Sequence, residues 1–107
     1  MLGTIRIMSK AGREEKKVQV CDAGAVISLR WNNDGSALAT AGEDGSVKIW
    51  SRSGNLRSAI AQTSSSVYTL VWGPDNDQIL FSSGHNLIIK TIQVRRRALN
   101  PSFIHER

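Results

Sequence analysis

Short runs of alternating apolar and polar residues follow one another along this chain, and each run is bounded by glycine, asparagine, aspartate, serine or proline. Alternation with a period of two is typical of β-strands that bury one face. Because the connections have hairpin length, we expect antiparallel meanders and no helix. The expected strands are residues 4–8, 16–21, 25–31, 36–41, 46–50, 56–61, 66–72, 78–83 and 87–92.

The clearest of these runs covers residues 42–50, where an acidic glycine turn leads directly into an alternating strand. Asp44 and Gly45 are residue types that favour the positive φ values of a tight hairpin turn. After the turn, Val47 and Ile49 are expected to share one face of the strand. This stretch therefore predicts a turn followed by a half-buried strand.

Two weaker copies of this pattern predict an internal repeat of about 40 residues. Residues 3–12 match residues 45–54 at an offset of 42 (45 − 3 = 42), and residues 26–31 match residues 67–72 at an offset of 41 (67 − 26 = 41). The turn after Trp72 is interpreted as one residue longer than the turn after Trp31, which returns the offset to 42. That alignment sets Leu38 beside Leu80 and Lys48 beside Lys90.

A period near 42 with four short strands, a glycine turn and a strand ending in Val-Lys-Ile-Trp at residues 47–50 resembles the WD-repeat family of β-propellers. The resemblance implies an all-β fold of antiparallel four-stranded blades, here about two and a half of them. The expected blades are residues 3–21, 25–61 and 66–93, followed by a basic, disordered tail at 94–107. The family usually has Trp-Asp where this chain has Trp-Ser.

Members of this family often hold a blade together by hydrogen bonds among a histidine, a serine or threonine, an aspartate and the tryptophan. The resemblance places Thr40, Asp44 and Trp50 at three of these positions, with Gly45 in the turn, but the histidine position holds Asp22. In the next copy the aligned positions hold Thr63, Ser82, Asn86 and Ile92. We therefore expect an incomplete hydrogen-bond network in both copies. Backbone N–H groups of the turn that contains Asp44 are expected to donate to its carboxylate.

The runs at residues 24–32, 42–51 and 54–58, and those at 67–68, 72–75 and 87–90, resemble the WD-repeat subunits of intraflagellar transport complex B. This second resemblance covers about residues 3–93. This resemblance implies a non-catalytic scaffold that binds other subunits of that complex at the cilium, basal body and axoneme. The expected partner-binding rim is formed by loops that contain Asp22, Glu43, His85 and Asn86. Two alternatives are a truncated product without a function of its own and a basic-tail nucleic-acid binder.

Composition narrows these alternatives. The chain has 107 residues, of which 40% are apolar and 21% charged, which is typical of one globular unit. Its net charge of +5 is concentrated in residues 93–107, where Arg95, Arg96 and Arg97 are found. No aromatic residue interleaves with these arginines before Phe103, so a solubilising tail is favoured over a nucleic-acid site.

Candidate chemistry is sparse, and we expect no enzyme, no cofactor and no metal site. The chain has a single cysteine, Cys21, and neither His85 nor His105 has a nucleophile or ligand at a useful spacing. No apolar run is long enough for membrane insertion, so a cytoplasmic protein is expected.

Trp31, Trp50 and Trp72 recur at strand ends, and packing between blades is favoured for them over a base-stacking platform. Because blades bury their faces only against neighbours, the open faces around Trp31 and Trp72 predict a loose or aggregating monomer. The oligomeric state is left open.

Overall fold

The computed structural model describes residues 3–21 and 24–92, which form nine strands and no helix. All nine expected strands are present, with ends that differ from the expected ones by at most two residues. The strands are β1 (Gly3–Met8), β2 (Glu14–Cys21), β3 (Val26–Trp31), β4 (Ala37–Gly42), β5 (Ser46–Ser51), β6 (Leu56–Gln62), β7 (Val67–Trp72), β8 (Gln78–Ser83) and β9 (Asn86–Thr91).

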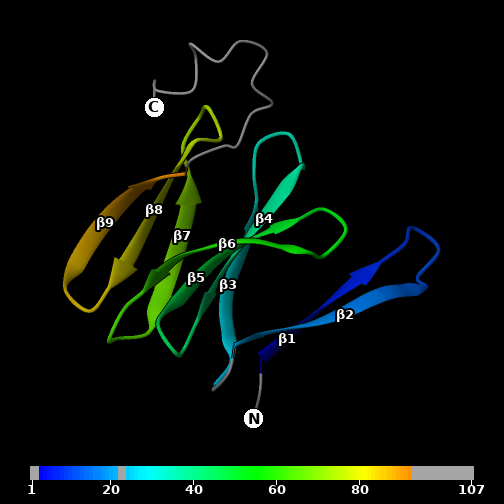
Figure 1. Ribbon diagram of the computed structural model, residues 1–107, viewed down its shortest axis with the longest axis horizontal. Helices are drawn as coiled ribbons and strands as arrows, with labels where there is room; N and C mark the ends of the chain where they lie inside the picture. Colours follow the sequence, from blue (N-terminus) through cyan, green and yellow to red (C-terminus); the bar gives the residue numbers. More distant parts are fainter. Residues whose placement is uncertain (1–2, 22–23, 93–107) are drawn as a thin grey trace, which may run out of the picture.

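The strands form three antiparallel sheets in chain order, β1–β2, β3–β4–β5–β6 and β7–β8–β9. Figure 1 shows them side by side, with β1 and β2 on the right and β9 on the left. Every strand pairs with its neighbour in the sequence, as short hairpin connections require. The middle sheet has four strands, whereas the first has two and the third has three. The expected all-β fold of incomplete WD-type blades is confirmed.

The main hydrophobic core lies between the middle and third sheets. Ala37, Ala39 and Ala41 of β4 are buried there against large side chains of the third sheet, including Leu70 and Phe81. The small alanine side chains allow the two backbones to approach closely, and Leu70 and Phe81 fill the space.

A second core cluster covers the opposite face of the middle sheet. Leu38 of β4 and Trp50 of β5 pack there against Ile5, Val20 and Cys21 of the first sheet. Because consecutive residues of β4 point to opposite faces and both faces are covered, all of β4 is buried. The middle sheet is thus the only one whose two faces both pack against another sheet in the described chain.

The strand register corrects the repeat alignment in β8. Leu29 pairs with Thr40 in the middle sheet, and Leu70, which corresponds to Leu29, pairs with Phe81. Phe81 therefore occupies the place of Thr40, and the expectation that Ser82 does so is wrong. The offset stays at 41 because the turns after Trp31 and Trp72 have the same length: Asn32 N–H bonds to Ala37 O, and Gly73 N–H bonds to Gln78 O.

The same correction applies to β9. Leu38 pairs with Trp50, whereas Ile79, which corresponds to Leu38, pairs with Lys90. Lys90 therefore takes the place of Trp50, and the alignments of Lys90 with Lys48 and of Ile92 with Trp50 are wrong. A shorter turn between β8 and β9 causes this shift. The third sheet consequently lacks both the threonine and the tryptophan that the middle sheet uses.

Candidate functional site

Antiparallel meanders place alternate loops at opposite ends of the sheets. We call one end the Glu43 rim, defined by residues 24–25, 43–45, 63–66 and 84–85. We call the other end the Asn33 rim, defined by residues 9–13, 32–36, 52–55 and 73–77. The expected partner-binding residues Glu43 and His85 lie on the Glu43 rim, and Asn86 follows it at the start of β9.

Glu43 connects three loops of its rim. Ala25 N–H donates to Glu43 Oε1 at 2.7 Å, and Glu43 N–H donates to Ala25 O at 2.9 Å. Ser66 Oγ donates to Glu43 O at 2.8 Å. A hydrogen bond to a carboxylate is stronger than one between neutral groups, so the bond from Ala25 N–H helps Glu43 to position the rim. Glu43 is also exposed on this rim.

The adjacent turn is fixed by Asp44. Ser46 N–H and Ser46 Oγ donate to Asp44 Oδ1 at 3.0 and 2.7 Å, which closes a local turn. Gly45 has a φ of +84° and its carbonyl oxygen accepts from Thr63 N–H at 2.8 Å. Asp44 thus receives a backbone N–H from its own turn, and Gly45 ties that turn to the loop before β7.

Trp50 and Thr40 are joined inside the second core cluster. Trp50 Nε1–H donates to Thr40 Oγ1 at 3.0 Å, with Trp50 4% exposed and Thr40 fully buried. A buried indole N–H needs such a partner because leaving it unpaired costs free energy. Two positions of the network that the resemblance implied are therefore in direct contact. Asp22, at the histidine position of that network, lies outside the described residues.

The other two tryptophans differ from Trp50 in their surroundings. Trp72 is half-buried beside the main core and donates from Nε1 to Arg30 O of the neighbouring sheet at 2.8 Å. Trp31 is 48% exposed because the first sheet covers only part of that face of the middle sheet. A shallow hollow of about 160 Å³ lies there, lined by Trp31, Met8 and Leu29 among others.

His85 and Asn86 are exposed, and neither side chain hydrogen-bonds another described residue. Both side chains are therefore accessible to a partner that approaches the Glu43 rim. The arginines at 95–97, on which the nucleic-acid alternative rests, lie outside the described residues.

Sequence reasoning missed the contact between the two long turns of the Asn33 rim. Asn33 Nδ2 donates to the carbonyl oxygens of Gly73 and Pro74, both at 3.0 Å, and Asn33 N–H donates to Asn76 Oδ1 at 2.8 Å. These bonds join the middle and third sheets at the end opposite Glu43. No spacing rule points to Asn33, because its partners are about 40 residues away and are mostly backbone atoms.

A second missed feature had a visible signal, the tripeptide Asp-Gly-Ser that occurs at 34–36 and again at 44–46. In both copies the serine donates from its backbone N–H and its hydroxyl to the aspartate. The two bonds from Ser36 hold the pKa of Asp34 below its ordinary value. The chain therefore uses one turn type at both ends of β4.

Residues 3–21 and 24–92 contain no group of three or more histidine, cysteine, aspartate or glutamate side chains placed to hold a metal ion. The same residues contain no helix that could cross a membrane. Cys21 is fully buried, and burial, followed by the Asp44 carboxylate, raises the pKa of its thiol.

We predict that Cys21 reacts with a thiol reagent only when the first sheet detaches or the chain unfolds. The pKa of the Cys21 thiol is higher in the folded chain than in the unfolded chain. The contribution of the neutral thiol to the free energy of unfolding is therefore complete below the ordinary thiol pKa of 9.0, and it is lost as pH rises through the pKa of the folded state. The measurement is the rate of modification by 5,5′-dithiobis(2-nitrobenzoate) with and without denaturant. Equal rates in both conditions would contradict a buried thiol.

Comparison with known proteins finds a family model that matches part of the chain and several similar proteins. Residues 15–51 match the model described as WD domain, G-beta repeat, which begins in β2 and ends with β5. The chain is 48% identical over 97 residues to the proteins named intraflagellar transport protein 80 homolog of Mus musculus and of Rattus norvegicus. These matches cover 91% of this chain but only 12% of each relative's length.

A more distant match is the F-box-like/WD repeat-containing protein TBL1X of Mus musculus, 42% identical over 55 residues, or 51% of this chain and 10% of that protein.

Proposed function

From its membership of the WD-repeat family, we propose that this chain acts as a non-catalytic protein-interaction module and contributes to a subunit of intraflagellar transport complex B. The observation that carries the proposal is the 48% identity to intraflagellar transport protein 80 homologs, which extends over nearly the whole chain. Its partners would be other subunits of the complex, in the cytoplasm and at the cilium, basal body and axoneme.

The Glu43 rim supports this proposal as the binding surface. Glu43, Asp44 and Gly45 hold three loops together through hydrogen bonds to their backbone atoms and to the Glu43 carboxylate, so the rim is organised before a partner arrives. A preorganised surface loses less conformational entropy when it binds. The exposed side chains of His85 and Asn86 lie beside this surface without hydrogen bonds to other described residues, and they would supply direct contacts to the partner.

The proposal is tested by co-sedimentation of the chain, alone and within its longer relative, with purified complex B subunits. The double substitution His85→Ala and Asn86→Ala is expected to weaken binding by about tenfold, as loss of one or two good interface contacts does. A matched control is Asp75→Ala with Asp77→Ala, which removes two exposed side chains from the Asn33 rim.

Failure of the folded chain to bind any complex B subunit would overturn the proposed function. Equal losses from the His85/Asn86 pair and the Asp75/Asp77 pair would keep the scaffold but reject the Glu43 rim as its binding surface. The substituted residues are exposed, so circular dichroism and thermal unfolding should not distinguish these variants from the unsubstituted chain.

A further inference from the structure

The four turns of the Asn33 rim lie in a fixed order across the three sheets. Gly54, in the turn between β5 and β6, is buried, and a Cβ added to it would meet the side chains of Ile7 and Lys16 of the first sheet. Asn33 joins the turn between β3 and β4 to the turn between β7 and β8. From the first sheet to the third, the order of the turns is therefore 9–13, 52–55, 32–36 and 73–77.

Charge is segregated along this order. The charged residues of the two turns nearest the first sheet are all basic, and they are Lys10, Arg13 and Arg52. The charged residues of the two turns nearest the third sheet are all acidic, and they are Asp34, Asp75 and Asp77. All six side chains are exposed, and none forms an ion pair with another described residue. The Asn33 rim therefore has a basic end and an acidic end.

We call the basic end the Lys10 surface, defined by Lys10, Arg13, Lys16 and Arg52. Lys16 belongs to it because its Nζ donates to Asn55 Oδ1 at 2.7 Å, which ties β2 to the turn between β5 and β6. Arg13 N–H donates to Ser9 Oγ at 3.1 Å, and Ser9 N–H donates to Arg13 O at 2.8 Å. The backbone that carries these cations is thus held in place, so binding would order little more than their side chains.

Two acidic residues, Glu14 and Glu15, lie beside the Lys10 surface in the sequence. Glu14 is paired with Arg6, at 3.5 Å between Arg6 Nε and Glu14 Oε1. Glu15 forms no ion pair with a described residue, so four cations face one such carboxylate. Outside β1, β2, their turn and Arg52, the described residues include four basic and five acidic side chains. The positive charge of the described chain is therefore concentrated at this end.

From these observations we propose that the Lys10 surface binds an acidic segment of a partner protein, whose glutamate or aspartate side chains pair with the four cations. The segment is short, because the rim becomes acidic at Asp34. Each exposed ion pair contributes little, so binding is weak and needs several contacts together. The Lys10 surface lies at the end opposite the Glu43 rim, and the inference does not depend on the proposed function.

A short acidic peptide fits this pattern better than a long polyanion does. A nucleic acid or an anionic membrane presents continuous negative charge, which would meet the carboxylates of the acidic end as it continues along the rim. The two basic turns contain no aromatic residue that could stack on a base. Residues 93–107 carry a net positive charge, so electrostatic repulsion disfavours them as the ligand of this surface.

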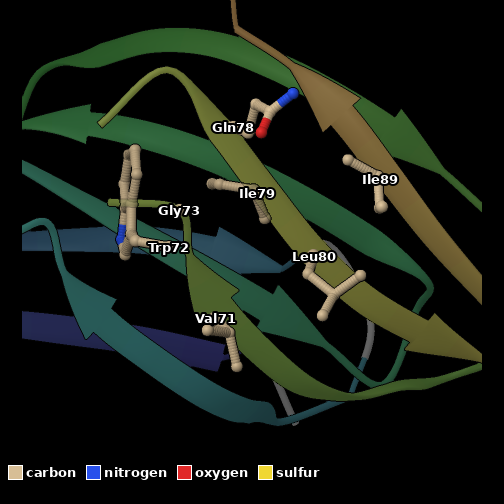
Figure 2. A pocket seen from close by; sticks show the side chains of 7 residues that line it. All are labelled: Val71, Trp72, Gly73, Gln78, Ile79, Leu80 and Ile89. Atoms are coloured by element: carbon tan, nitrogen blue, oxygen red, sulfur yellow. The ribbon is translucent and has the colours of Figure 1, made fainter. Parts of the chain in front are cut away.

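The acidic end of the rim offers an acidic segment no second site. Figure 2 shows Gly73 and Gln78, which flank the turn that carries Asp75 and Asp77, beside a hollow of about 200 Å³. The other side chains that line this hollow are mainly apolar, and none is basic. An acidic segment is therefore repelled by the turn and finds no cation in the hollow.

The first test uses a capped peptide of about ten residues that contains about six glutamates. It is titrated into the ¹⁵N-labelled 107-residue chain in about 0.02 M NaCl, and amide chemical shifts are followed by NMR. We expect shifts at residues 9–16 and 52–55 that saturate together. In about 0.3 M NaCl the Kd should rise by about tenfold or more, because the Debye length falls to about 6 Å. The same peptide with lysine in place of glutamate should not bind.

The second test reverses two charges of the surface. Lys10→Glu with Arg52→Glu should weaken binding of the acidic peptide by about tenfold or more, since two attractive contacts become repulsive. The matched control is Arg30→Glu with Lys90→Glu, which changes the net charge equally at two exposed positions. Arg30 pairs with Ala39, which faces the third sheet, and Lys90 lies in that sheet. The control should weaken binding by less than about twofold.

Three results would overturn this proposal. They are an absence of shifts at residues 9–16 and 52–55, which includes the case in which the peptide binds only residues 93–107; equal weakening by the two double substitutions; and displacement of the peptide by an equal concentration of an oligonucleotide of the same charge. Amide signals of β4 and β5 distinguish lost binding from lost folding, since the four substituted side chains are exposed and these signals should not change.

Discussion

Gly45→Ala is expected to destabilise the chain by roughly 2–5 kcal/mol. Gly45 has a φ of +84°, a region in which an L-residue costs about 1–2 kcal/mol. An added Cβ would also overlap the carbonyl oxygen of Thr63, whose N–H bonds to Gly45 O. Relief of that overlap must separate the turn from the loop before β7, which adds about 1–3 kcal/mol. The measurement is the urea unfolding midpoint at a fixed, low protein concentration.

Gly12→Ala provides the control for this prediction. Gly12 has nearly the same φ, +86°, but no atom beyond its chain neighbours lies within 4 Å of its added Cβ. Its substitution should cost only the conformational part, about 1–2 kcal/mol. If Gly12→Ala and Gly45→Ala shift the midpoint equally, the contact between Gly45 and Thr63 is not what stabilises the rim.

Thr40→Val should destabilise the chain by about 1–3 kcal/mol, although valine has nearly the same shape as threonine. The substitution removes the acceptor of the buried Trp50 indole N–H, and an unpaired buried donor carries this cost. The free energy of unfolding from urea titration, followed by tryptophan fluorescence, measures the effect.

A double-mutant cycle separates this hydrogen bond from packing. Trp50→Phe removes the donor, so Thr40→Val in that background should cost much less than it does alone. The difference between the two values is the coupling energy of the pair. Additive losses would show that Thr40 contributes through its packing and not through its hydroxyl.

The strand pattern of this chain could be predicted from the sequence because it depends on local chemistry. The alternation of apolar residues such as Val47 and Ile49 with polar ones indicates which face of a strand is buried. Asp44 followed by Gly45 indicates a turn, independently of the rest of the fold. All nine strands and their antiparallel pairing followed from such signals. The resemblance to WD repeats likewise depended on residues close together in the chain.

The register of the third sheet could not be read in the same way. Leu80 and Phe81 are both apolar, so a shift by one residue leaves a sequence alignment equally convincing, although it exchanges the two faces of β8. Only the pairing of Leu70 with Phe81 shows which one takes the place of Thr40. Hydrogen-bonded ladders fix register through many contacts at once, and an alignment of single residues does not contain them.

The sequence by itself determined an all-β chain of repeated hairpins with one well-formed WD-type strand at residues 46–50. The tertiary structure decided which distant residues contact one another: Glu43 contacts Ala25 and Ser66, and Asn33 contacts the turn after Trp72. It also decided that β9 pairs with β8 alone among the described residues. The reason is that strands and turns are set by neighbours in the chain, whereas rims and open edges are set by which sheets lie beside one another.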